Sequence, residues 1–324
     1  MVENAPLVSV IIPVYNRPDM LLEAVNSVLT QTWRPLEIIV VDDGSTDETT
    51  GQSDRLAETY PEVKVIHQEN AGAGAAREAG RLVARGEYIQ YLDSDDLLLP
   101  DKLEHQIAAL RSQPECDLAY GKTTLLQQGR EPDWTAWKDT GRYMPQIFPH
   151  FLWRRAWVTS SPLIKRELSD RAGPWLSLRN NEDWEYDCRL GALGAQLCFV
   201  DEFVSITRRH DSNISGQLPE KASLYDRAQV QQLIWQHAKM AGIKDSEPAA
   251  QHFASSVFLL ARQCASMGMS KESEQLLALT GSIEQPLGKR LNLSVYRLIT
   301  ALVGGELATR FTQSMYNLTS RRSE

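Results

Sequence analysis

The chain has 324 residues, 42% of them hydrophobic, and a formal net charge of −8. This length suits one large or two ordinary domains, and the acidic balance excludes nucleic acid as a main partner, because such binding rests on clustered cations that meet phosphates. The four widely spaced cysteines form no CxxC pair, which argues against zinc and disulfide frameworks and favours a reducing, cytoplasmic compartment. An anionic ligand such as a diphosphate would need a bound metal or a local cluster of arginines in so acidic a chain.

The first 120 residues alternate apolar, β-branched runs with amphipathic segments. Strands are predicted over Val8–Ile12, Leu36–Val41, Val63–Ile66, Tyr88–Leu92, Asp117–Tyr120 and Leu197–Thr207. Helices are predicted over Leu21–Leu29, from a Ser45-x-x-Glu48 capping box to Tyr60, over Ala71–Ala84, from Pro100 through Leu110, and over Trp184–Leu193. Strands separated by helices predict an α/β fold: a mainly parallel sheet flanked by helices, which binds ligands at the carboxyl ends of its strands.

The pattern changes to helical from about Ser223, and we predict a domain of residues 1–215 followed by a helical region of residues 216–324. Ala249–Ala265 and Lys271–Leu279 predict a helical hairpin joined at Gly268. No run reaches the roughly 18 apolar residues of a membrane helix, and the N-terminus lacks a secretory pattern. Residues Leu291 to Phe311 are apolar with a few charges, so they either rest on a membrane surface or pack against the rest of the chain. The helices also offer a surface for self-association.

An aspartate triplet follows the predicted strand that ends at Leu92. Asp93 and Asp95 are two positions apart, so on an extended segment both side chains aim at one point. Two convergent carboxylates suit a hard divalent cation such as Mg²⁺ or Mn²⁺. The alternative is that the aspartates cap the next turn or helix.

Three further polar segments follow predicted strands or open predicted helices. Asp43 lies at the end of the second predicted strand. One interpretation is that its carboxylate accepts a hydrogen bond from a ribose hydroxyl or a base N–H; the other is that the residue only forms part of a turn. The small residues before Arg77 would let a backbone approach a nucleotide while Arg77 meets a phosphate, unless Arg77 points outward from a tightly packed helix. Glu182-Asp183 begins a predicted helix. One interpretation is a catalytic base at the mouth of the ligand-binding crevice at the carboxyl ends of the strands; the other is a pair of negative charges that interact favourably with the helix dipole. His210 follows the last strand, with a metal, phosphate or structural role.

Together these segments resemble the family 2 glycosyltransferases, whose fold is called GT-A. The resemblance covers about Val8 to Ser215, and its members act on nucleotide sugars with inversion. The stretches that carry it are Val8-Ser-Val-Ile-Ile-Pro-Val-Tyr-Asn16, Ser27-Val-Leu-Thr-Gln-Thr-Trp33, Glu37-Ile-Ile-Val-Val-Asp-Asp-Gly-Ser-Thr-Asp47, Asn70-x-Gly72 with Ala76-Arg77, Gly86-Glu-Tyr-Ile-Gln-Tyr-Leu-Asp-Ser-Asp-Asp96 and Glu182-Asp183. Each is modestly specific, and their common order and spacing make coincidence a poor explanation.

The resemblance implies a nucleotide-sugar half, residues 1–120, and an acceptor half, residues 121–215. The donor site would comprise Pro13, Tyr15, Asp43, Arg77, Asp93 and Ser94. The cation, Mn²⁺ or Mg²⁺, would be held by Asp95, Asp93 and His210. Asp183 would deprotonate the acceptor hydroxyl with support from Glu182, and a segment that includes Trp153, Arg154, Arg155 and Trp175 would shape the acceptor side.

The implied reaction is transfer of a sugar, usually from a UDP-linked donor, to a hydroxyl of a glycan, a glycolipid or a related molecule, as in polysaccharide biosynthesis. Three alternatives compete with it. A carboxylate-pair glycoside hydrolase would leave the first 95 residues unexplained. A nucleotidyltransferase would need a glycine-rich, basic triphosphate loop near the N-terminus. A non-catalytic sugar-nucleotide-binding protein would need no Asp183.

Overall fold

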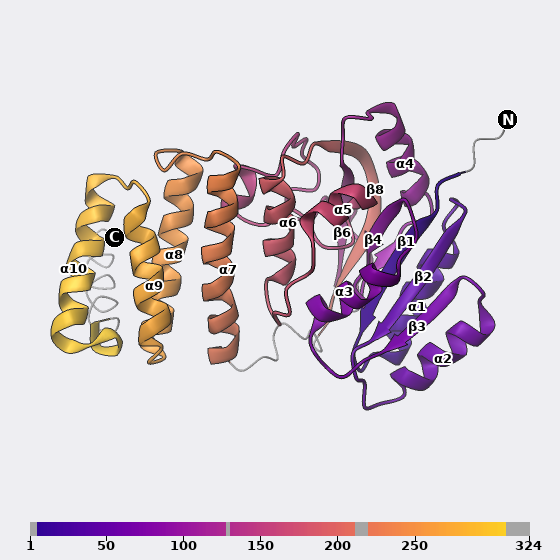
Figure 1. Cartoon of the computed structure of the whole chain (residues 1–324), viewed down its shortest axis with the longest axis horizontal. Coiled ribbons are helices and arrows are strands. Elements are labelled where there is room, and N and C mark those ends of the chain that lie inside the picture. The colour runs from indigo at the N-terminus through magenta and orange to yellow at the C-terminus, as the bar shows by residue number, and fades with distance from the viewer. Residues whose placement is uncertain (1–4, 128–129, 211–219, 309–324) are drawn as a thin grey trace. The chain divides into compact units, whose positions relative to one another are not determined.

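A computed structural model describes residues 5–127, 130–210 and 220–308 (Figure 1). The chain divides into two compact units, Met1–Gly216 and Gln217–Glu324. The domain boundary expected after residue 215 falls between residues 211 and 219, which lie outside the described residues.

The first unit is built on an eight-stranded sheet in the order β3-β2-β1-β4-β7-β6-β8-β5. The strands are β1 (Val8–Val14), β2 (Leu36–Asp42), β3 (Val63–His67), β4 (Tyr88–Tyr91), β5 (Leu97–Leu98), β6 (Leu118–Gln127), β7 (Leu163–Lys165) and β8 (Leu197–Arg209). β1 pairs in parallel with β2 and β4, and β6 pairs in parallel with β8. The mainly parallel α/β sheet is therefore confirmed. Two short antiparallel strands, β5 and β7, carry too few residues to show a period and were not predicted.

Helices cover both faces of this sheet, as its fully buried strands require. They are α1 (Pro18–Leu29), α2 (Thr49–Thr59), α3 (Ala73–Val83), α4 (Lys102–Ser112), α5 (Arg166–Ala172) and α6 (Glu182–Ala192), with a 3₁₀ turn at His150–Leu152. Alternate residues of β1, such as Val10 and Ile12, share one core with buried residues of α1 and α4. Ile11 points to the opposite face, where it lies against Gly80 of α3. The period of two along β1 thus assigns each side chain to one helical layer.

The predicted capping box at Ser45 and Glu48 is wrong. Helix α2 begins at Thr49, and Glu48 is its N-cap without a capping side-chain hydrogen bond. The Ser45 hydroxyl instead accepts the backbone N–H of Asn16 at 3.0 Å, and the Ser45 N–H donates to Asp42 at 3.0 Å. Because these contacts hold Ser45 in the loop after β2, the helix starts one turn later.

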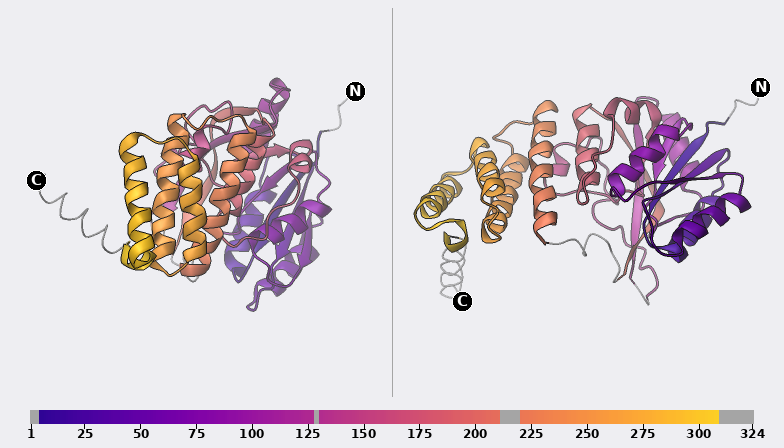
Figure 2. Two further views of the ribbon diagram at one scale, coloured as in Figure 1. Left: turned by 60° about the vertical axis from the view of Figure 1, so that its left-hand side comes forward. Right: turned by 60° about the horizontal axis from the view of Figure 1, so that its bottom comes forward.

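Within residues 220–303, the second unit is built of helices that lie side by side (Figures 1 and 2). They are α7 (Glu220–Met240), α8 (Pro248–Ser266), α9 (Ser270–Ser282) and α10 (Leu287–Val303). The expected hairpin is confirmed: α8 and α9 meet at Gly268, whose φ of +72° favours glycine. Among the described residues, no helix combines the length and the apolar character needed to cross a membrane. Phe311, the expected end of the apolar stretch, lies outside the described residues.

Candidate active site

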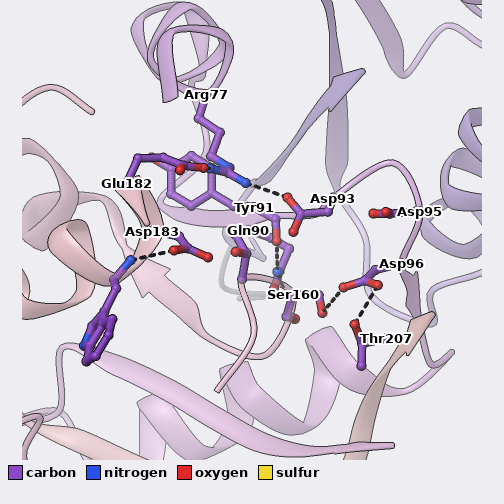
Figure 3. A network of polar contacts seen from close by, with 12 residues as sticks. Arg77, Gln90, Tyr91, Asp93, Asp95, Asp96, Ser160, Glu182, Asp183 and Thr207 are labelled. Carbon is purple, nitrogen blue, oxygen red and sulfur yellow. Dashed lines mark hydrogen bonds and ion pairs between the residues drawn. The ribbon is translucent and has the colours of Figure 1, made fainter. Parts of the chain in front are cut away.

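The residues singled out in the sequence gather where several elements end. β1, β2 and β4 run in parallel, so the segments that follow them share one edge of the sheet. The N-terminus of α6 and the end of β8 are joined to this edge by side-chain contacts. Figure 3 shows Arg77 with Glu182 and Asp93, while Asp95 and Asp96 lie beyond Asp93.

The three aspartates after β4 have three different environments. Asp93 is one-third exposed and binds Arg77 Nη2 at 2.6 Å. Asp95 contacts His210 Nε2 at 3.1 Å and forms an ion pair with Arg17. Asp96 is buried and accepts hydrogen bonds from Ser160 and Thr207 at 3.2 and 2.9 Å, as Figure 3 shows. Burial, followed by the nearby Asp95 and Asp93 charges, raises the pKa of Asp96 well above its usual value. Asp96 therefore joins the turn to β8 and to the segment before β7, whereas the carboxylates of Asp93 and Asp95 are engaged by cationic or imidazole side chains.

Arg77 stands at the centre of the acidic groups. Its buried guanidinium binds Asp93 at 2.6 Å and Glu182 at 2.7 Å, and it lies 4.8 Å from the Trp175 ring centroid. Burial disfavours its charge, but Asp93, Glu182 and Asp183 outweigh burial and raise the pKa of Arg77. The alternative of an outward-pointing Arg77 is wrong. Two carboxylates engage its guanidinium, so its direct effect is to position them.

Asp43 closes the loop that precedes α3. Its carboxylate accepts hydrogen bonds from Gln68 Nε2 at 2.7 Å and from the backbone N–H groups of Ala71 and Gly72 at 2.8 Å each. A carboxylate offers about four acceptor positions, so these three donors leave room for one more. Asp43 can therefore accept a hydrogen bond from a base N–H while its other hydrogen bonds hold the loop before α3 in place.

Asp183 is the partly exposed carboxylate at the start of α6. Its side chain is 26% exposed, it forms an ion pair with Arg155, and it accepts the N–H of Trp184 at 2.7 Å. Burial favours the neutral acid, but Arg155, Arg77 and Lys138 outweigh burial and lower the pKa of Asp183. At neutral pH Asp183 is therefore an ionised carboxylate that solvent can reach.

Glu182 is chemically distinct from its neighbour. It is buried, and burial raises its pKa although Arg77 acts in the opposite direction. Asn181, in the left-handed region at φ +61°, immediately precedes α6. The turn sends Glu182 toward Arg77 and Asp183 toward Arg155, so two adjacent carboxylates have different partners.

The three side chains expected to hold a cation are not gathered as one set. Within residues 5–127, 130–210 and 220–308, no group of three or more His, Cys, Asp or Glu side chains is arranged to hold a metal. Asp95 and His210 are in contact, whereas Asp93 is bound to Arg77. A carboxylate beside an imidazole fits Mn²⁺ or Mg²⁺, which often bind through one or two carboxylates and complete their shell with phosphate oxygens and water.

Cations that the sequence reasoning missed surround Asp95. Arg17 follows β1 and reaches the Asp95 carboxylate, and Arg208 donates from Nε to the Asp95 carbonyl. The only sequence signal for Arg17 was its place directly after a strand at the ligand-binding edge. Arg17 and Arg208 are the local arginines that so acidic a chain needs to accept a diphosphate.

Arg155, expected on the acceptor side, bridges Asp183 and Asp187. Its Nε lies 2.6 Å from Asp187, and burial raises the pKa of Asp187 to about 6 although Arg155 opposes the rise. The spacing of Asp183 and Asp187, four residues apart on one helix face, was the available signal for this pair.

The remaining candidates lie around the same edge. Pro13 is buried in β1, Tyr15 is half-buried just beyond it, and Ser94 is buried in the turn after β4. Trp175 is buried and stacks on Tyr186, with ring centroids 4.0 Å apart. Its ring also packs against the Arg77 guanidinium.

Comparison with protein families matches residues 9–173 to the model described as Glycosyl transferase family 2. An uncharacterized glycosyltransferase, YibD, of Escherichia coli K12 is 44% identical over 104 residues, which are 32% of this chain and 30% of that protein. Glycosyltransferase GlyG of Streptococcus pneumoniae is 44% identical over 99 residues, 30% of this chain and 33% of that protein. The matched segment spans about a third of the length of each of these relatives.

Solved structures share the fold over nearly the whole chain. Staphylococcus aureus TarS 1–349 in complex with UDP-GlcNAc superposes with a TM-score of 0.69 at 20% identity and covers 96% of this chain and 92% of that one. The mannosyltransferase PcManGT of Pyrobaculum calidifontis, in complex with GDP-Man and Mn²⁺, gives 0.51 at 19% identity, with 97% and 87% covered. The expected GT-A-like fold is confirmed by these similarities.

Proposed function

Because this chain belongs to the family 2 glycosyltransferases, we propose that it transfers a sugar from a nucleoside diphosphate donor to an acceptor hydroxyl. The donor is a UDP-sugar, and the acceptor is a hydroxyl of a glycan or a glycolipid. Structural neighbours solved with UDP-GlcNAc and with GDP-Man support the class of donor.

The environment of Asp183 is the observation that carries this proposal. It is an ionised, 26% exposed carboxylate, joined through Arg77 and Glu182 to the edge that carries Asp93 and Asp95. The acceptor hydroxyl attacks the anomeric carbon as Asp183 takes its proton. The bond from that carbon to the diphosphate oxygen breaks, and the nucleoside diphosphate leaves as an anion. One displacement inverts the anomeric configuration, and a positioned base contributes roughly 10²–10⁴ to the rate.

The donor diphosphate belongs beside Asp95. Arg17 and Arg208 supply positive charge there, and Asp95 with His210 would hold Mn²⁺ or Mg²⁺. The bound cation would act as a Lewis acid that offsets the charge of the leaving group. Asp43 and its loop, with Pro13 and Tyr15, would line the nucleoside, and Arg77 would position Asp93 and Glu182 around the sugar. Residues 1–120 would hold the donor, and residues 121–215 would shape the acceptor side.

Asp183→Asn tests the base. Because the amide keeps the shape but cannot take a proton, turnover should fall by roughly 10²–10⁴. The donor is first chosen by screening nucleotide sugars for thermal shift, and calorimetry with that donor should find the same affinity in variant and wild type. Near-wild-type turnover would remove Asp183 from the mechanism. Loss of both turnover and donor binding would indicate a role in the donor site instead.

Asp95→Ala tests the cation site. In the wild type, Mn²⁺ should strengthen binding of nucleoside diphosphate, whereas in the variant the nucleotide affinity should no longer respond to Mn²⁺. Calorimetry with and without the cation measures both states. Asp101→Ala, which changes an aspartate at the N-cap of α4, is the matched control and should retain the Mn²⁺ response. An undiminished response in Asp95→Ala would exclude Asp95 as a ligand.

A further inference from the structure

Helix α10 carries an apolar stripe on its exposed side. Five side chains on this stripe are between 53% and 75% exposed: Leu287, Leu291, Val295, Leu298 and Leu302. At 3.6 residues per turn they fall within an arc of about 80°. The exposed face is therefore a continuous apolar band along the helix, rather than scattered leucines.

The opposite side of α10 is firmly packed. Leu293 and Tyr296 are buried, and the Tyr296 ring meets Phe258 of α8 edge-on, with centroids 5.4 Å apart. Arg297 donates to the Leu277 carbonyl of α9 at 2.7 Å. These contacts fix the rotation of α10 about its axis, so the apolar band stays turned away from α8 and α9.

An apolar outer face is unusual for a helix in this place. α10 is the last described helix of the α7–α10 stack (Figure 2), and the terminal elements of stacked helices normally present a polar outer face. A band of five large apolar side chains is instead the kind of patch that marks an interaction surface.

The net positive charge of α10 indicates what covers the band. α10 carries Lys289, Arg290 and Arg297 and has no acidic residue. Residues 287–324 contain six Lys and Arg against two Glu, although the whole chain has a net charge of −8. Three of these six cations lie on α10 itself, so the helix that exposes the apolar band is basic within an acidic chain.

We propose that the outer face of α10 binds anionic lipid, with the helix lying in the plane of the membrane interface. Its apolar band would enter the boundary between headgroups and acyl chains, and Arg290, which flanks the band, would meet the negative headgroups, whereas Lys289 donates to Ser255 of α8 on the packed side. A second copy of α10 fits less well, because the helix has no acidic residue that could pair with Arg290 beside the band of the other copy. The outer face of α10 is therefore better suited to an anionic bilayer than to the same face of a second copy.

Flotation of the full chain with vesicles tests this proposal. Binding to vesicles of phosphatidylcholine with 30% phosphatidylglycerol should be at least tenfold stronger than binding to pure phosphatidylcholine. The triple variant Leu291→Gln, Leu298→Gln, Leu302→Gln should lose this binding. A double variant of exposed leucines elsewhere, Leu82→Gln with Leu259→Gln, should retain it. Arg290→Gln should weaken binding severalfold.

Two parallel measurements separate the alternatives. Because the three leucines are exposed, the triple variant should melt at the wild-type temperature; a clear drop would mean that the chain itself covers the band, and would overturn the proposal. Light scattering should find the same mass for wild type and variant without lipid. If the wild type were a dimer, the triple variant a monomer, and neither bound vesicles, the apolar band would be a contact with a second copy. That result would also overturn the proposal.

Discussion

Two buried arginines determine how the carboxylates of the site behave. Arg77 joins Asp93 to Glu182, and Arg155 joins Asp183 to Asp187. A carboxylate beside a cation remains ionised although burial opposes its charge. Arg155 therefore keeps the accessible Asp183 ionised, whereas at the buried Asp187 burial outweighs the same arginine and raises the pKa to about 6.

Replacing Arg155 by methionine should change the pH dependence of the reaction. A general base is inactive when protonated, so kcat/KM falls as the pH drops through its pKa. Arg155 is the largest of the effects that lower the pKa of Asp183. Without this charge the pKa of Asp183 rises, and the acid limb of the kcat/KM profile should move to higher pH.

Arg154→Met is the matched control for that profile. Arg154 is the adjacent arginine, but it is 62% exposed and binds Asp139 at 2.7 Å. Its profile should coincide with that of the wild type. If Arg155→Met also kept the wild-type acid limb, Arg155 would not control the ionisation of the base.

At the scale of elements, the small residues of α3 allow close approach between segments distant in sequence. A Cβ atom on Gly74 would lie 2.0 Å from the Leu176 carbonyl oxygen, and one on Gly80 would lie 2.4 Å from Ile11 of β1. The first glycine brings α3 against the segment before α6, and the second seats it on the sheet. The glycines of α3 thus serve packing at both of these positions.

Gly74→Ala should destabilise the first unit. The added methyl group meets backbone, which must shift, and overpacking of this kind typically costs about 1–3 kcal/mol. Because Glu182 and Arg77 lie at the same junction, activity should fall as well. Urea unfolding compared with Gly51→Ala gives the control, since a Cβ on Gly51 of α2 meets only the end of Arg55 at 3.4 Å. That control should be neutral or stabilising by up to about 1 kcal/mol; equal stability of Gly74→Ala and wild type would contradict the packing argument.

At the scale of the whole molecule, a net charge of −8 hides two local concentrations of positive charge. One is the pair of Arg17 and Arg208 at Asp95, and the other is helix α10, which carries three cations and no acidic residue. Each lies where an anionic group is proposed to bind, a diphosphate in the first unit and lipid headgroups in the second. Overall charge excluded nucleic acid but could not locate these sites.

The sequence by itself determined the elements and their order. Buried β-branched runs such as Val8–Val14 form parallel strands, and amphipathic spacing marks α1 and α4, because both depend on the period of neighbouring residues. The aspartates after β4, and the likeness to the family, could also be read from local stretches.

Only the tertiary structure decided which side chains meet. Arg77 is 16 positions from Asp93 and 105 from Glu182, and Arg17 is 78 positions from Asp95. Such partners are chosen by how helices and strands pack, and local periodicity carries no information about them. β5 and β7 were not predicted for a related reason: strands of two and three residues form because they pair with strands distant in the sequence. The chemistry of the site lies in these long-range contacts, which exist only once the chain has folded.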